Sequence, residues 1–116
     1  MLKWHLRADR TYLINLDGPV GPVIGCGNDL FQALQVIRLE LETSGWLIAV
    51  QGARKDAYAS GMVRDMIGAS RIYILRTGQQ VEREHLVDIF AEAPPDSLGT
   101  VEQQKSCYRD WRLSLT

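Results

Sequence analysis

Cysteine and histidine are scarce in this chain. It holds two cysteines, Cys26 and Cys107, and two histidines, His5 and His85. Two cysteines are too few for a disulfide framework, and neither lies in a C-x-x-C or Cys/His spacing typical of a metal site. We therefore expect two reduced thiols, no metal site and no cofactor.

Excess charge and long apolar runs are also missing. With 13 Lys and Arg against 14 Asp and Glu, the formal net charge is -1, so no overall field attracts nucleic acid or an acidic membrane. No stretch approaches the roughly 18 apolar residues of a membrane span, and the first residues lack the apolar run of a signal peptide. We expect a cytoplasmic protein that does not bind membranes.

No set of residues has the pattern of a catalytic site. The sequence Gly25-Cys26-Gly27 precedes a predicted helix, but the third glycine of G-x-G-x-x-G would fall at Leu30, so a structural turn explains it better than a phosphate-binding loop. Neither histidine stands beside a nucleophile and an orienting acid. We predict a non-enzymatic protein.

The first half of the chain predicts a hairpin followed by a helix. Apolar residues alternate over residues 3–16, whereas residues 17–28 are rich in glycine and proline and predict a loop with one short edge strand at 23–24. Asp29 is a suitable N-cap, and apolar residues then recur at helical spacing over 30–41 until Gly45.

The second half predicts two central strands and two further helices. The apolar runs 46–50 and 71–76 are typical of central strands, with a short helix at 62–67 between them, and helical spacing follows over 81–93 and 100–115. Because strands and helices do not alternate, we predict one α+β domain over residues 1–116. Its antiparallel or mixed sheet would have four to five strands, with helices packed mainly on one face.

A polar segment between the two predicted central strands is the candidate binding site. Loops that follow central strands commonly carry function, and Tyr and Arg are common anchors of protein interfaces. The residues that we assign to partner binding are Arg54, Lys55, Asp56, Tyr58, Ser60, Arg64 and Asp65. The alternative is that these charges balance one another around a connection that Tyr58 and the methionines pack.

The last helix carries a basic aromatic patch, which is the second candidate interface. Its residues are Lys105, Tyr108, Arg109, Trp111 and Arg112. Such a patch can stack on RNA bases, but a stripe of Tyr108 and Trp111 facing the core explains it more simply, and Glu102 and Asp110 dilute the charge. We do not expect nucleic-acid binding.

The stretch G-A-R-K-D-A-Y-A-S-G-M-V-R-D-M at 52–66, with Tyr73 and residues 86–90, resembles a small family of bacterial proteins. We connect this family with the immunity proteins of polymorphic toxin and contact-dependent growth inhibition systems. The resemblance implies a cytosolic protein that binds one cognate toxin domain tightly and blocks its active site or its activation. Two alternatives stay open: a small enzyme or ligand-binding domain that uses the 54–65 segment, and a self-associating homodimer.

Overall fold

The computed structural model describes residues 2–19 and 21–116. This part of the chain holds six strands, three α-helices and three short 3-10 helices. The predicted α+β class is confirmed. The strands form two antiparallel sheets of three strands each, which corrects the prediction of one sheet with four to five strands.

The N-terminal sheet has the order β1-β2-β3 and consists of β1 (Leu2–Leu6), β2 (Tyr12–Gly18) and β3 (Gly21–Gly27). The predicted hairpin of β1 and β2 is confirmed. The edge strand predicted at 23–24 is confirmed as part of β3, but the loop predicted for the rest of 17–28 is wrong, because β3 pairs with β2 along its whole length. Its glycines allow close packing: a Cβ at Gly25 would overlap the carbonyl oxygen of Ala33.

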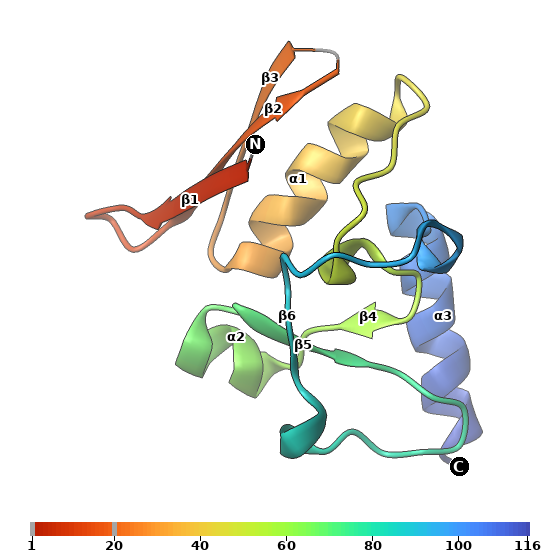
Figure 1. Ribbon diagram of the computed structural model, residues 1–116. Helices are drawn as coiled ribbons and strands as arrows, with labels where there is room; N and C mark the ends of the chain where they lie inside the picture. The colour runs from red at the N-terminus through yellow and green to blue at the C-terminus, as the bar shows by residue number, and fades with distance from the viewer. Residues whose placement is uncertain (1, 20) are drawn as a thin grey trace.

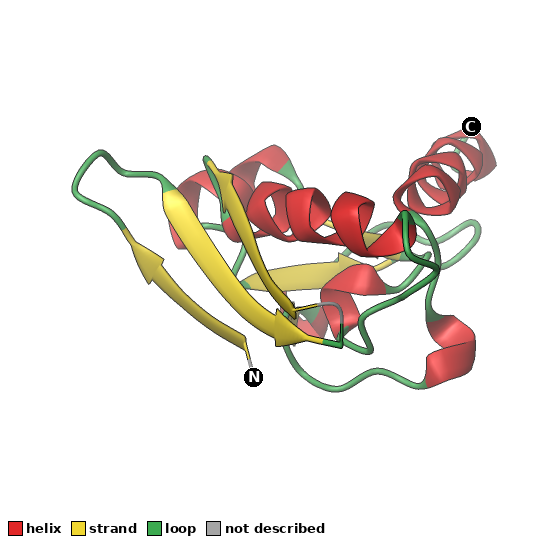
Figure 2. Cartoon of the chain, turned by 90° about the horizontal axis from the view of Figure 1, so that it is seen from above, coloured by secondary structure: helices red, strands yellow, loops and turns green. Residues whose placement is uncertain are grey.

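Helix α1 (Leu30–Glu42) lies along one face of this sheet (Figures 1 and 2). As predicted, Asp29 caps it, and the Asp29 carboxylate accepts a 2.8 Å hydrogen bond from the backbone N–H of Gln32. Leu30, Leu34 and Ile37 are fully buried. The opposite side of α1 contacts the 3-10 helix η1 (Gln51–Ala53) and the C-terminal helix α3 (Val101–Ser114).

The strand predicted over 46–50 is wrong. Trp46 and Leu47 are exposed, and only Val50 forms a bridge, to Glu92. An apolar run forms a central strand only where a neighbouring strand can satisfy its backbone. Here the chain crosses the surface irregularly and enters η1 instead.

The second sheet, order β4-β5-β6, consists of β4 (Ala57–Tyr58), β5 (Arg71–Ile74) and β6 (Val87–Asp88). Helix α2 (Gly61–Ile67) confirms the short helix predicted at 62–67, and it connects β4, which was not predicted, to β5. The helix predicted over 81–93 is wrong, because this segment forms the 3-10 helix η2 (Arg83–His85) and then β6. The backbone of this segment forms the antiparallel pairing with the edge of β5, where Val87 lies opposite Ile72.

Helix α3 (Val101–Ser114) follows the 3-10 helix η3 (Pro95–Ser97) and confirms the predicted C-terminal helix. Thr100 and Gln103 form a capping box at its start. Figure 1 shows α3 beside the second sheet, on the side away from the N-terminal sheet. One cluster of buried residues, including Ile14, Leu34 and Ile72, joins both sheets and α1.

Candidate functional site

A groove opens where α1, β4, the start of α2 and α3 meet. Its volume is about 380 Å³, within the usual range for sites that receive a ligand or a few side chains of a partner. The lining residues are Phe31, Gln35, Ala57, Tyr58, Arg64, Gln104, Lys105, Tyr108 and Arg109. The groove is therefore built from aromatic, amide and cationic side chains.

Three aromatic rings form a cluster at the side of the groove. Tyr58 and Tyr108 stack with ring centroids 4.5 Å apart and an interplanar angle of 18°, and Trp111 lies 6.0 Å from each of them. All three side chains are half-buried. Burial, and then the neighbouring Tyr108 hydroxyl, raise the pKa of Tyr58 to about 12, so Tyr58 stays neutral in neutral solution.

A buried polar network fixes α3 against α1 and η1. Gln104, which is 3% exposed, donates from Nε2 to the carbonyl oxygens of Gly52 (3.1 Å) and Arg54 (2.8 Å). Its Oε1 accepts from Arg38 Nη1 at 2.8 Å, and Arg38 Nη2 donates to the Gly99 carbonyl at 2.9 Å. Because the Arg38 and Gln104 side chains are buried and hydrogen-bonded, the network holds the α3 wall of the groove in one position.

Arg64 is held at the opposite side of the groove. Its Nε donates to the Ala59 carbonyl at 3.1 Å, and its Nη1 lies 3.1 Å from the buried carboxylate of Asp29. The guanidinium also lies over the Phe31 ring, 5.0 Å from the centroid. No hydrogen bond of its Nη2 is found within the described residues, so a donor remains free for a bound group.

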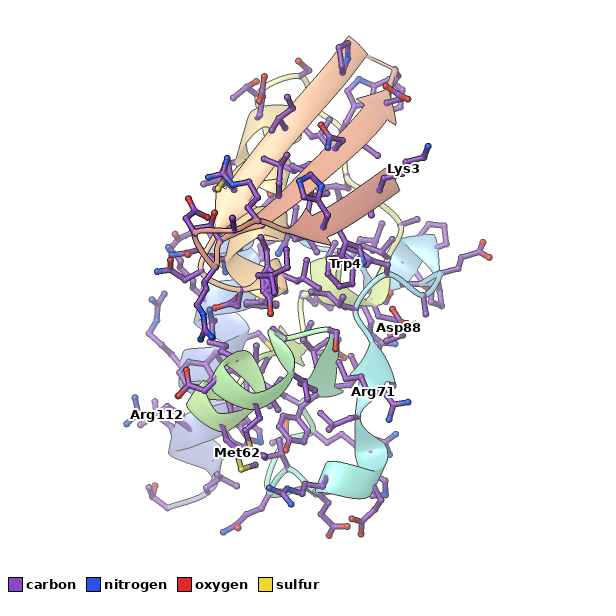
Figure 3. All side chains as sticks on the ribbon, turned by 90° about the vertical axis from the view of Figure 1, so that its left-hand side faces the viewer. Lys3, Trp4, Met62, Arg71, Asp88 and Arg112 are labelled. Atoms are coloured by element: carbon purple, nitrogen blue, oxygen red, sulfur yellow. The ribbon has the colours of Figure 1, made fainter. Side chains whose placement is uncertain are left out.

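The rim of the groove on α3 is cationic. Lys105 and Arg109 line the groove, and the Arg112 guanidinium lies 5.8 Å from the Tyr108 ring centroid. All three are exposed. Figure 3 shows Arg112 extending from α3 on the side of the molecule opposite Arg71 and Asp88.

The predicted partner-binding residues divide into two groups. Tyr58 and Arg64 meet at the groove, whereas the others lie outside its lining. Arg54 and Asp56 bind each other through two hydrogen bonds of 2.8 and 3.0 Å, and Ser60 caps α2 by accepting from the Val63 N–H at 3.3 Å. Arg54, Asp56 and Ser60 therefore have structural contacts.

Lys55 and Asp65 complete the predicted set. Both side chains are exposed, and within the described residues neither forms a hydrogen bond or ion pair. The structure thus leaves them available at the surface but places neither in the groove lining.

Several groove residues escaped the sequence prediction or received a different role in it. Lys105, Tyr108 and Arg109 were visible as a basic aromatic patch, but the spacing of Tyr108 and Trp111 favoured the core, whereas both rings are half-buried. Phe31, Gln35 and Gln104 carried no local signal. Their roles depend on the packing of α1 against α3, which joins residues far apart in the chain.

The groove is suited to recognition. Its lining contains no carboxylate, imidazole or thiol, so it offers stacking, hydrogen bonding and positive charge. Elsewhere in the described chain, His85 lies 3.9 Å from Glu82 at the surface. Burial, and then the nearby Asp56 and Asp110 charges, raise the pKa of Cys107, which lowers its thiolate content.

Within residues 2–19 and 21–116, none of the helices is long and apolar enough to cross a membrane. A scan of protein-family models finds none that matches this chain. A search of curated proteins finds no significant match either.

Proposed function

We propose that the chain is a non-catalytic binding protein that neutralises a cognate bacterial toxin domain by tight association in the cytoplasm. The groove between α1 and α3 is the proposed contact surface. The partner class comes from the resemblance of residues 52–66 to a family connected with immunity proteins. The contact surface comes from the geometry of the groove.

The aromatic cluster carries this proposal. Tyr58, Tyr108 and Trp111 stack against one another while each keeps part of its ring exposed. Tyrosine, tryptophan and arginine are enriched among the residues that dominate the binding energy of protein interfaces. Tyrosine and tryptophan bury a large area at a small cost in side-chain entropy. A stacked cluster beside arginines therefore has the composition of an interface centre.

The rigidity of the groove supports the same conclusion. The Arg38–Gln104 network fixes α3, and the Asp29–Arg64 pair fixes the opposite side. Binding costs less free energy when the contacting groups are already ordered in the free protein. A preorganised groove suits a protein that must block a toxin tightly.

The exposed residues of the 54–65 segment extend the proposed surface. Tyr58 and Arg64 contact the partner in the groove, and Lys55 and Asp65 form peripheral contacts. Peripheral charges mainly affect the association rate and its salt dependence. Replacement of Tyr58 should therefore cost more affinity than replacement of Lys55.

Co-purification tests the proposal. The tagged protein, expressed from its native operon, is washed stringently, and mass spectrometry identifies what remains bound. We expect one stoichiometric partner that inhibits growth when it is expressed alone and does not when it is co-expressed with this chain. Recovery of the chain alone, with unchanged growth inhibition on co-expression with toxin domains of the same operon, would overturn the proposal.

A further inference from the structure

Helix α3 presents a row of positive charges, of which Lys105 and Arg109 line the groove and Arg112 lies outside the lining, against the Tyr108 ring. Lys105, Arg109 and Arg112 are spaced i, i+4 and i+7, which places them on one face of the helix. Tyr108 lies on the same face and stacks on Tyr58. The row is therefore adjacent to the aromatic cluster.

This positive charge is largely uncompensated. Within the described residues Lys105 and Arg112 form no ion pair, and Arg109 has one contact of 3.8 Å, with Glu102, in which both side chains are more than half exposed. Like charges at i, i+4 destabilise a helix. The helix dipole favours cations only near the last turn, so it does not account for Lys105 in the first half of α3.

The acidic residues of α3 do not offset this charge at the groove. Asp110 lines a different hollow, together with Cys107 and Trp111, and Glu102 is absent from the groove lining. Asp29 is 6% exposed as a whole residue, and its carboxylate already binds Arg64. The groove is thus a local positive site on a chain whose net charge is -1.

The groove also offers polar groups that suit a peptide. Gln35 is half-buried in its wall, and its side chain forms no hydrogen bond within the described residues. An amide side chain both donates and accepts, so it matches a peptide backbone. The free Nη2 of Arg64 adds a charged donor that favours a carboxylate.

We infer that this groove binds an acidic peptide segment of the partner, with carboxylates on the Lys105–Arg109–Arg112 row and an aromatic or other apolar side chain against Tyr58 and Tyr108. This inference rests on the proposed function for the identity of the partner. The chemistry of the docked segment comes from the groove: uncompensated cations, exposed aromatic faces and an unpaired amide.

The dimensions favour a peptide over a nucleic acid. From Lys105 to Arg112 the helix rises roughly 10 Å, which matches about three residues of an extended peptide. Single-stranded nucleic acid is usually bound along a longer positive track of at least about four nucleotides.

The first test uses probes that do not require the toxin. The isotope-labelled protein is titrated with a short peptide that has glutamates on both sides of one tyrosine, and the amide signals are followed by NMR. We expect shifts at Gln35, Tyr58 and Tyr108. The matching lysine peptide should leave these signals unchanged, and raising the salt concentration well above the physiological range should weaken the acidic peptide several-fold.

Charge reversal supplies the matched variants. The double variant Lys105→Glu/Arg109→Glu should bind the acidic peptide at least about tenfold more weakly than the wild type. Lys3→Glu, which removes an exposed lysine on β1, should change the affinity for the acidic peptide less than about twofold. Circular dichroism confirms that each variant is folded. Equal binding of both peptides, an unchanged affinity of the double variant, or tighter binding of oligothymidylate would each overturn the inference.

A second measurement separates this inference from the proposed function. If a toxin domain co-purifies and the double variant binds it as tightly as the wild type, the acidic-segment inference is wrong and the neutralising function stands. If the acidic peptide binds at the groove and no toxin domain is neutralised, the proposed function is wrong and the groove chemistry stands.

Discussion

Arg38 on α1 and Gln104 on α3 are joined by a hydrogen bond of 2.8 Å between Nη1 and Oε1. Both residues are 3% exposed, and within the described residues Arg38 has no carboxylate within ion-pair distance. Burial lowers the pKa of Arg38 to about 10, and the Glu42 charge opposes this effect. Arg38 is therefore a buried cation whose charge is stabilised by carbonyl and amide oxygens.

Gln104→Leu should destabilise the protein by about 3 kcal/mol. The substitution removes an acceptor from the Arg38 guanidinium and leaves the carbonyls of Gly52 and Arg54 without the Gln104 donor, and unsatisfied buried groups are costly. Urea unfolding measures the change. Gln80→Leu, at an exposed glutamine, is the control and should stay within about 0.5 kcal/mol of wild type. Equal stability of the two variants would show that the network is not a major structural element.

Gly25→Ala should destabilise the fold by at least about 2 kcal/mol, because the new methyl group would overlap backbone of α1 at Ala33 and press on Ile37. Gly61→Ala is the matched control. A Cβ at Gly61 meets no atom within 4 Å, and alanine favours the helix start, so this variant should be neutral or slightly more stable. Thermal unfolding compares the two. A tolerated Gly25→Ala would contradict the close packing of α1 on β3.

These glycines explain part of what the sequence does not reveal. In a strand, glycine weakens β propensity, so 17–28 has the composition of a loop. The actual reason for Gly25 and Gly27 is the approach of α1, which is a long-range contact. By contrast α1 and α3 follow from local capping at Asp29 and Thr100 together with helical spacing, and both were predicted.

The wrong predictions of a strand over 46–50 and a helix over 81–93 have a related cause. The apolar residues of both segments are compatible with more than one structure, and the outcome depends on which neighbouring strand has backbone groups that still need hydrogen bonds. Strand β5 has an open edge that β6 satisfies, whereas Trp46 and Leu47 find no strand and remain exposed. Strand pairing is non-local, so the periodicity of one segment does not determine it.

The candidate site was also only partly predictable. Tyr58 and Arg64 belong to the polar segment that the sequence singled out, and the structure places both in the groove. Arg54 and Asp56 are two residues apart in the chain and pair with each other. A single sequence does not show whether neighbouring opposite charges bind a partner or bind each other.

The pKa of Tyr58 predicts a specific alkaline response. Burial raises it to about 12, above the value of about 10 of an unfolded tyrosine. The folded state thus favours the neutral phenol, and its contribution to stability is complete below pH about 10 and is lost as the pH rises through about 12. Urea midpoints between about pH 9 and about pH 11 should fall more steeply for wild type than for Tyr58→Phe. The contribution of Arg38 to the pH dependence is the same in both proteins, so it cancels in the comparison. Parallel curves would contradict the burial of the phenol.

Asp29→Ala should cost about 2 kcal/mol, since the carboxylate both caps α1 and binds Arg64. A double-mutant cycle with Arg64→Met isolates the pair and should give a coupling of roughly 0.5–1 kcal/mol, because Arg64 is part-exposed. Asp65→Ala, at an exposed carboxylate one residue from Arg64, is the control. Denaturant unfolding provides the values. Equal effects at Asp29 and Asp65 would exclude a special role for Asp29.

The affinity of the co-purifying toxin domain for Tyr108→Ala tests the central claim most directly. Tyr108 is the ring that joins Tyr58, Trp111 and Arg112, and removal of an interface anchor typically costs about 2 kcal/mol or more. Trp46→Ala removes an exposed ring outside the groove and controls for the loss of an aromatic side chain. Calorimetric titration should give at least about a tenfold weaker Kd for Tyr108→Ala and an unchanged Kd for Trp46→Ala. An unchanged Kd for folded Tyr108→Ala would contradict the account and move the interface away from the groove.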